Sequence, residues 1–155
     1  MPHIHEKIDF VVSAWIVHGG RVLLVFHKGQ QTWLPVGGHI ELDEDPIEAL
    51  YREVREECGL VDIEIIGAIR NSDYPSESTT KLLLTPAYLD IHPINNTHRH
   101  VALEYFVKAK SDTVKLADGE HDRIRWFVMS EIDEPRYNIL PAIKFFAKEA
   151  LRKVQ

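Results

Sequence analysis

The chain has 155 residues, of which 45% are hydrophobic and 27% charged, and its formal net charge is -6. This length suits one domain, expected over residues 1–155, and lets about 70% of the unfolded surface become buried. The composition excludes a bilayer span, because no apolar run reaches ~18 residues, and it disfavours nucleic acid as a partner, because no Lys/Arg stripe appears.

The N-terminal third of the chain begins with a predicted β-hairpin. The first residues, MPHIHEKIDF, lack the basic-then-apolar order of a signal peptide, so we expect a cytoplasmic protein without a membrane partner. The segments from Ile8 to Val17 and from Val22 to Phe26 are rich in Val, Ile and aromatic residues, and Gly19-Gly20 separates them. A short strand from Trp33 to Glu41 follows, interrupted by a proline and a glycine pair.

A helix is predicted immediately after that strand. Asp45 suits the N-cap, Pro46 the first helical position, and Glu48 the return bond of a capping box. Gly59 is typical of a left-handed stop. The apolar stripe between these signals consists of Ile47, Leu50, Tyr51, Val54 and Cys58. Cys58 is the single cysteine, so no internal disulfide is expected, and its place on the stripe indicates a buried structural thiol.

Three carboxylates, Glu53, Glu56 and Glu57, lie on one face of this helix at i, i+3 and i+4. The arc that they occupy is centred about 125° from the apolar stripe, so we expect it to look away from the core. Repulsion between like charges at this spacing costs only a few tenths of a kcal/mol, so a solvated acidic face is one interpretation. The other is a site for a hard divalent cation such as Mg²⁺, which prefers oxygen ligands.

The remaining elements complete a mixed α/β pattern. Strands are expected at Ile63 to Arg70, Lys81 to Ile91, Val101 to Ala109 and Arg123 to Met129. A terminal helix is expected from Asn138 to Val154, with an inward face of Leu140, Ile143, Phe146, Ala147, Ala150 and Leu151. Many strands with two helices predict an α/β class protein with a helix on each side of a mixed β-sheet.

The segment from Gly38 to Leu60 resembles the Nudix box of the Nudix hydrolases at every specified position. Gly38 is followed after five residues by Glu44, and after seven more by Arg52-Glu53-Val54-Arg55-Glu56-Glu57-Cys58-Gly59-Leu60. The resemblance implies the Nudix fold, an α/β/α sandwich, with the glutamates of the box as metal ligands, Gly38 as a carbonyl ligand, and Glu44 and Arg52 as supporting residues. Glu53, Glu56 and Arg52 are then catalytic candidates, and Gly38, Glu53, Glu56 and Glu57 metal ligands.

The activity implied by this resemblance is pyrophosphohydrolysis with Mg²⁺, or Mn²⁺ as the alternative ion. The expected partner is a small nucleotide, namely a nucleoside diphosphate linked to another moiety, which covers nucleoside triphosphates, ADP-ribose and dinucleoside polyphosphates. A nucleotide-binding regulatory domain without catalysis is the alternative function. Homodimers are common in the family, so the resemblance also allows a homodimer.

Candidates outside the box are fewer. Nudix sites often use one further loop carboxylate, for which we assign Glu120, with Asp118 and Asp122 as alternatives. Trp33 is assigned as a base-stacking residue, against the alternative of core packing. Tyr74 is assigned to substrate binding, because the proline after it resembles one associated with ADP-ribose pyrophosphatases of the family.

Two further segments allow more than one interpretation. The stretch from Glu120 to Phe127 resembles one seen in dinucleoside tetraphosphate hydrolases. It therefore points to a dinucleoside polyphosphate, whereas the proline after Tyr74 points to ADP-ribose. His92, His98 and His100 form a candidate zinc cluster, but a polar turn that leads into a strand is the favoured interpretation, since no Cys or acidic ligand lies at metal-binding spacing beside them.

Overall fold

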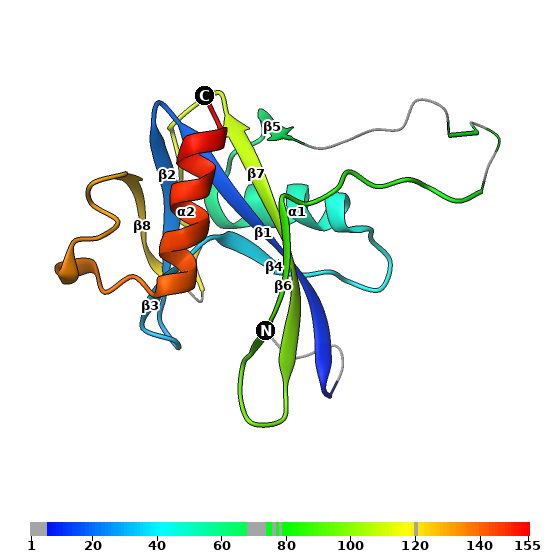
Figure 1. Cartoon of the computed structure of the whole chain (residues 1–155), viewed down its shortest axis with the longest axis horizontal. Coiled ribbons are helices and arrows are strands. Elements are labelled where there is room, and N and C mark those ends of the chain that lie inside the picture. The colour runs from blue at the N-terminus through cyan, green and yellow to red at the C-terminus, as the bar shows by residue number, and fades with distance from the viewer. Residues whose placement is uncertain (1–5, 68–73, 76, 78, 120) are drawn as a thin grey trace.

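The computed structural model describes the chain except residues 1–5, 68–73, 76, 78 and 120 (Figure 1). Its described strands form one mixed sheet with a long helix on each side. In chain order the elements are β1 (Ile8–His18), β2 (Arg21–His27), β3 (Thr32–Leu34), β4 (Val36–His39), α1 (Pro46–Cys58), β5 (Ile63–Ile66), β6 (Tyr88–Pro93), β7 (Arg99–Ala109), β8 (His121–Val128), a 3-10 turn (Pro135–Tyr137) and α2 (Pro141–Lys153).

Strand β1 is the centre of the sheet. It pairs in parallel with β7 along nearly its whole length and antiparallel with β2 and β4. The main strand order is β3-β2-β1-β7-β5, with β4 also on β1, β6 on β7 and β8 on β2. The predicted hairpin is confirmed, because Gly19 and Gly20 connect β1 to β2 with φ of 55° and 71°, the positive angles that tight hairpin turns need.

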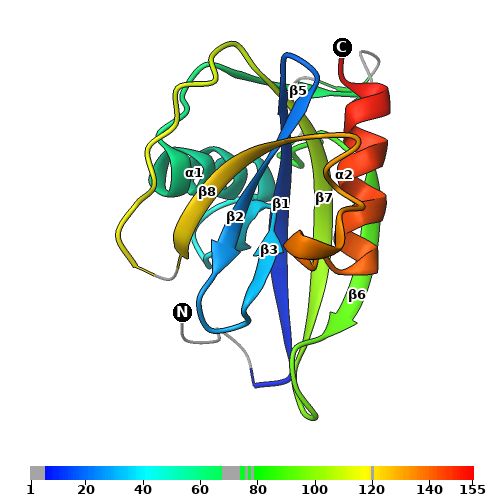
Figure 2. The same ribbon diagram turned by 90° about the vertical axis from the view of Figure 1, so that its left-hand side faces the viewer.

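The two helices cover opposite faces of the sheet (Figure 2). One core cluster packs Ala49, Leu50, Val54 and Cys58 of α1 against Val12, Ala14 and Ile16 of β1. The other packs Ala147 and Ala150 of α2 against Trp15 and Val17, the residues of β1 that point the other way. The predicted α/β/α sandwich is therefore confirmed.

Helix α1 has the ends that its sequence predicts. The Asp45 carboxylate accepts the backbone N–H of Ile47 (2.8 Å) and of Glu48 (3.0 Å), and the Glu48 carboxylate accepts the Asp45 N–H (2.8 Å). Gly59 ends the helix at φ 73°. These reciprocal bonds fix where the helix begins, and therefore which residues face β4. Cys58 is fully buried, as expected, and burial raises the pKa of its thiol to about 11.

Three predictions of secondary structure are wrong in part. The strand expected from residue 81 begins only at Tyr88, because pairing with β7 starts there and Pro86 in the preceding segment lacks an N–H for a ladder. Strand β5 ends at Ile66, since Gly67 has φ 77°, and residues 68–70 lie outside the described part. The terminal helix begins at Pro141, after a left-handed Asn138, and Leu140 is 47% exposed instead of inward.

A buried carboxyl lies in the α2 side of the sheet. Glu104 on β7 is 4% exposed, and the indole Nε1–H of Trp15 donates to its Oε2 over 2.5 Å. Burial, and then a hydrogen bond shared with Asp90, raise the pKa of this carboxyl to about 8. In the unfolded chain a Glu loses its proton near pH 4.3. Between these two values the folded state therefore binds more protons than the unfolded state.

This difference predicts that the free energy of unfolding falls as pH rises from about 5 to about 8. Glu104→Gln carries no titrating proton, so its stability should rise relative to the wild type by on the order of 1–3 kcal/mol over that range. Urea denaturation of both proteins at the two ends of the range measures the difference. Parallel pH profiles for the two proteins would contradict the shifted pKa.

Candidate metal and catalytic site

The glycine pair of β4 lies against the centre of α1. A Cβ on Gly38 would lie 2.3 Å from Oε1 of Glu53, and a Cβ on Gly37 would lie 2.1 Å from the backbone oxygen of Val12. Neither glycine has the positive φ that would explain its presence by a turn. Close approach is therefore the reason for both glycines, and at Gly38 the group that approaches is a carboxylate of the box.

Arg52 organises the acidic groups around it. Its Nε and Nη2 donate to the two oxygens of Glu44, over 2.9 and 2.5 Å, in a bidentate pair. Its Nη1 donates to Glu53 (2.7 Å) and, more weakly, to Glu56 (3.3 Å), and Nη2 also donates to the backbone oxygen of His39 (3.0 Å). One guanidinium thus ties together the helix, the loop before it and strand β4.

The three helix carboxylates differ in burial. Glu53 is 3% exposed, so the expectation that the whole acidic face looks outward is wrong for this residue. The reason is Gly38, which leaves room for the Glu53 carboxylate between helix and strand. The side chain of Glu56 is 58% exposed, and Glu57 is half-buried and accepts the Gly37 N–H over 3.3 Å.

Burial and charge act in opposite directions on these groups. Desolvation raises the pKa of Glu53, although the hydrogen bond and charge of Arg52 lower it. The hydrogen bond from Arg52 is the main reason that the pKa of Glu44 is lowered. Glu44 is therefore the counter-ion of Arg52, which leaves the charge of Glu53 only partly compensated. A cation near Gly38 would favour the ionised form of Glu53.

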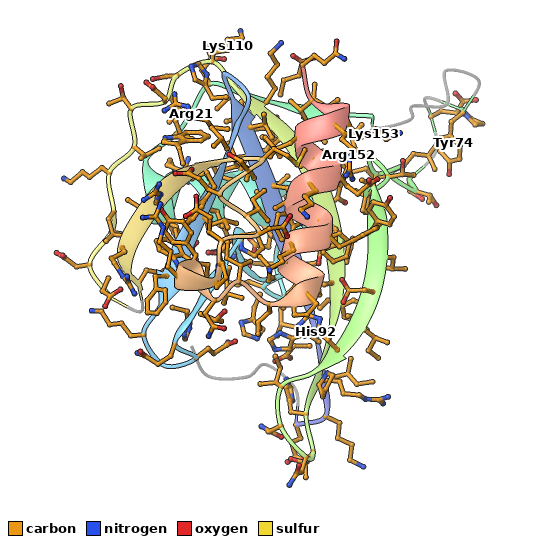
Figure 3. All side chains as sticks on the ribbon, turned by 60° about the vertical axis from the view of Figure 1, so that its left-hand side comes forward. Arg21, Tyr74, His92, Lys110, Arg152 and Lys153 are labelled. Atoms are coloured by element: carbon orange, nitrogen blue, oxygen red, sulfur yellow. The ribbon has the colours of Figure 1, made fainter. Side chains whose placement is uncertain are left out.

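The two predicted residues outside the box that the structure describes do not gather here. Trp33 is 4% exposed and packs edge-on against Phe26 and Phe127, with ring centroids 5.4 and 5.0 Å away. Its predicted role in base stacking is wrong, because its ring belongs to the core on the α2 side. Tyr74 lies away from the sheet (Figure 3), so the structure does not bring it to the carboxylates. Glu120 lies outside the described residues.

A groove of about 500 Å³ opens on the same face of the sheet as the carboxylates. Gly38 pairs with Val12 of β1, and Phe10, two residues earlier on that strand, therefore points to the same side. The apolar residues that line the groove are Phe10, Ile40, Leu42, Pro46, Leu89, Val101 and Leu103. Sequence reasoning missed it, because its walls come from three strands and a loop that are far apart in the chain.

On the face of the sheet opposite to the box carboxylates, the structure brings Asp9 and His39 to the predicted histidine cluster. His98 and His100 lie beside Asp9, and His39 approaches the same carboxylate. No signal near His98 in the sequence identifies either residue, because β1, β4 and β7 meet only in the sheet.

No helix in the part of the chain that the structure describes combines the length and the apolar character of a membrane span.

Comparison with known proteins finds relatives of this chain both by sequence and by fold. The model of the NUDIX domain matches residues 9–148. The structure resembles the crystal structure of a NUDIX family hydrolase from Clostridium perfringens with a TM-score of 0.82 and 31% identity, covering 95% of this chain and 98% of that one.

Curated relatives cover less of the chain. An RNA pyrophosphohydrolase of Halorhodospira halophila is 47% identical over 53 residues, which is 33% of this chain and 29% of that protein. A probable DHNTP pyrophosphohydrolase of Lactococcus lactis is 24% identical over 123 residues, which is 74% of this chain and 63% of that protein. The match therefore spans less than a third of the first relative and less than two thirds of the second.

Proposed function

The chain belongs to the Nudix hydrolase family, and from this premise we propose that it is a Mg²⁺-dependent pyrophosphohydrolase. Its substrate is a nucleoside diphosphate linked to another moiety, and the bond that it cleaves is a phosphoanhydride. The observation that carries this proposal is the close approach of Glu53 to Gly38, with Arg52 holding the carboxylates around it.

The residues around Gly38 fit a hard divalent cation. The donors are oxygens, which Mg²⁺ prefers, and the missing Cβ at position 38 lets the Glu53 carboxylate approach the backbone of Gly38. Glu53, Glu56, Glu57 and the backbone oxygen of Gly38 would hold the ion. When bound, the cation would neutralise the charge of a pyrophosphate and lower the pKa of a water molecule. Mn²⁺ has the same preference for oxygen and is the alternative ion.

The protein's own part in the reaction is to hold charges in place. The fork of Arg52 keeps Glu53 and Glu56 oriented, and Glu44 occupies the rest of the guanidinium, so Arg52 acts as a positioning residue. The base that accepts the proton of the attacking water stays a prediction. Glu120 is assigned to it, with Asp118 and Asp122 as alternatives.

The apolar groove beside Phe10 is our candidate binding site for the part of the substrate that is attached to the pyrophosphate. Leu89 is 67% exposed at its edge, so Leu89→Ser should leave the fold intact while removing apolar contact with a bound substrate. We expect KM to rise about tenfold with kcat retained, since contact with a Leu side chain contributes on the order of 1.5 kcal/mol. Leu140→Ser, at an exposed site beyond the groove, is the matched control. Unchanged KM values would remove the groove from the substrate site.

A substrate panel tests the proposed function. Nucleoside triphosphates, ADP-ribose, dinucleoside polyphosphates and nucleotide sugars are incubated with the protein and Mg²⁺, and phosphate-containing products are measured with and without a chelator. The proposal expects turnover of at least one member, lost on chelation. Binding of a nucleotide without any product would favour the alternative, a regulatory domain without catalysis.

A 5′-triphosphorylated RNA belongs in the same panel. The 47% identity to an RNA pyrophosphohydrolase over 53 residues favours this second candidate substrate. The net charge of -6 opposes it, because RNA binding depends strongly on basic contacts. Turnover of RNA in preference to free nucleotides would decide for the second candidate. A cytoplasmic location and a homodimer stay predictions.

A further inference from the structure

A second polar cluster lies on the face of the sheet opposite to the box carboxylates. The register between β1 and β7 aligns Asp9 with His100, and His98 is two residues before His100. The β1–β4 register aligns His39 with Val11. Asp9 is two residues before Val11 on β1, so Asp9 and His39 lie on the same face of the sheet. Side chains on β4 alternate, so Gly38 faces the box carboxylates and His39 faces this cluster.

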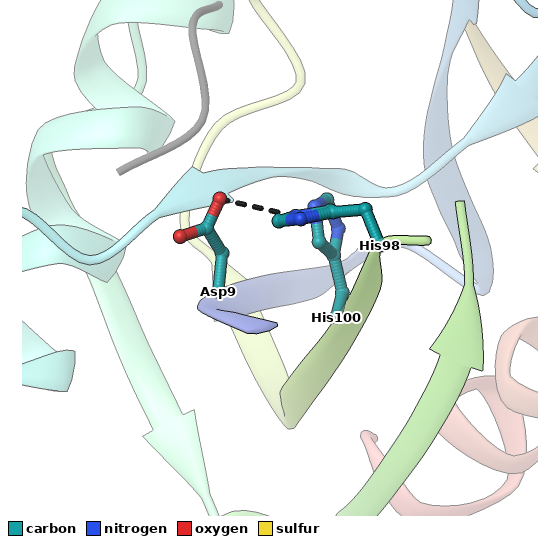
Figure 4. Close-up of side chains that lie close together, drawn as sticks. All are labelled: Asp9, His98 and His100. Atoms are coloured by element: carbon teal, nitrogen blue, oxygen red, sulfur yellow. Dashed lines mark ion pairs between the residues drawn. The ribbon is translucent and has the colours of Figure 1, made fainter. Parts of the chain in front are cut away.

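The cluster is compact and largely buried. The side chain of Asp9 is fully buried and that of His98 is 2% exposed. Oδ2 of Asp9 lies 3.2 Å from Nε2 of His98 and 3.2 Å from Nε2 of His39. One ligand atom each from Asp9, His98 and His100 lie within 4.8 Å of one another (Figure 4). A buried carboxylate is costly unless positive charge compensates it.

The hydrogen bond at the far side of the His98 ring determines what faces Asp9. Nδ1 of His98 lies 3.1 Å from the backbone oxygen of Glu6, and a carbonyl oxygen only accepts, so Nδ1 carries the proton. In a neutral imidazole Nε2 then has a lone pair, and this nitrogen lies 3.2 Å from Oδ2 of Asp9. An imidazole lone pair and a carboxylate oxygen are both electron-pair donors, so a metal ion is a ligand that both can bind.

We propose that Asp9, His98 and His100 bind a transition-metal dication such as Zn²⁺. Zn²⁺ takes imidazole nitrogens and carboxylate oxygens at about 2.0–2.2 Å, and in a tetrahedral site such bonds place neighbouring ligand atoms about 3.3 Å apart. The separation of 3.2 Å from Asp9 to His98 matches that edge. His39 lies equally near Asp9, but it is outside the group whose ligand atoms all lie within 4.8 Å of one another. A donated bond from the remote ring nitrogen to a carbonyl is also typical of a histidine that ligates metal.

This site is distinct from the box in chemistry and in position. Nitrogen ligands select Zn²⁺ over Mg²⁺, whereas the oxygens of the box select Mg²⁺. A metal here would join β1 to the start of β7 beside His39, whose backbone oxygen accepts from Arg52 and which follows Gly38 on β4. The site is therefore structural, and it would stabilise the sheet next to the strand that carries Gly38.

Cobalt provides the test, because four-coordinate Co²⁺ with nitrogen ligands absorbs visible light far more strongly than octahedral Co²⁺. Protein freed of metal by a chelator is titrated with Co²⁺ in excess Mg²⁺, which occupies the box, and then with Zn²⁺. We expect one equivalent of Co²⁺ with the strong absorption, displaced by Zn²⁺, and a rise in Tm on Zn²⁺ addition. His100→Gln and Asp9→Asn should each weaken binding by a factor of about 100 or more.

Two control variants separate the sites. His92→Gln changes a histidine whose side chain is 44% exposed and pairs with Asp90, and Glu56→Gln changes the box. Both should keep the Co²⁺ spectrum and the Zn²⁺ stoichiometry, and circular dichroism identifies any variant that does not fold. The proposal is overturned if the wild type takes up no stoichiometric Co²⁺ or Zn²⁺. It is equally overturned if the spectrum is lost in Glu56→Gln and kept in His100→Gln.

Discussion

Glu56→Gln and Glu57→Gln are each expected to lower kcat by a factor of about 10²–10⁴, because a catalytic metal contributes several kcal/mol to transition-state stabilisation. The substitution keeps side-chain volume and helix propensity while removing a ligand charge. Glu56 is more than half exposed, so its loss should cost little stability. The effect should therefore appear in turnover and in the Mg²⁺ concentration needed for half-maximal rate, and not in Tm.

Glu64→Gln is the matched control for these two variants. Glu64 is exposed on β5, and its replacement changes the net charge by the same amount without touching the box. Kinetics with the substrate identified by the panel, at saturating Mg²⁺, provide the comparison. Near wild-type rates in both box variants would show that the helix carboxylates do not hold a catalytic metal.

The parts of the site that depend on local sequence could be predicted from it. Asp45, Glu48 and Gly59 determine where α1 begins and ends, and the spacing of i, i+3 and i+4 then places the glutamates on one side of the helix. These signals act within a few residues of one another. The burial of Glu53 could not be predicted in the same way, because it depends on a missing side chain at Gly38 on a neighbouring strand.

Features that depend on strand register were beyond sequence reasoning. The approach of Asp9 to His98 joins residues almost ninety positions apart, and it follows from the parallel pairing of β1 with β7. The error at Trp33 has a related cause. Its position next to the box indicated a role in the site, whereas pairing of β3 with β2 turns its ring into the core on the α2 side. The local sequence pattern predicts where helices and strands lie, whereas strand pairing determines which side chains of a strand face the core.

Arg52→Lys is expected to lower kcat by a factor of about 10² or more even though the charge is kept. The guanidinium makes a bidentate pair with Glu44 and at the same time donates to Glu53 and to the backbone of His39. An ammonium is a compact charge without a planar fork, so it cannot hold all three groups. The Glu53 carboxylate, almost fully buried, would then lose its fixed orientation.

Arg55→Lys supplies the matched comparison, since Arg55 is exposed on the same helix. Steady-state kinetics and urea denaturation of both variants separate two contributions. Loss of a partner of buried Glu53 should lower the stability of Arg52→Lys by on the order of 1–3 kcal/mol, because part of a buried charge becomes unpaired. The loss in kcat should persist at temperatures and Mg²⁺ concentrations where the variant is fully folded. An Arg52→Lys enzyme with the kcat of Arg55→Lys would mean that only the positive charge at this position matters, and that the fork does not position the carboxylates.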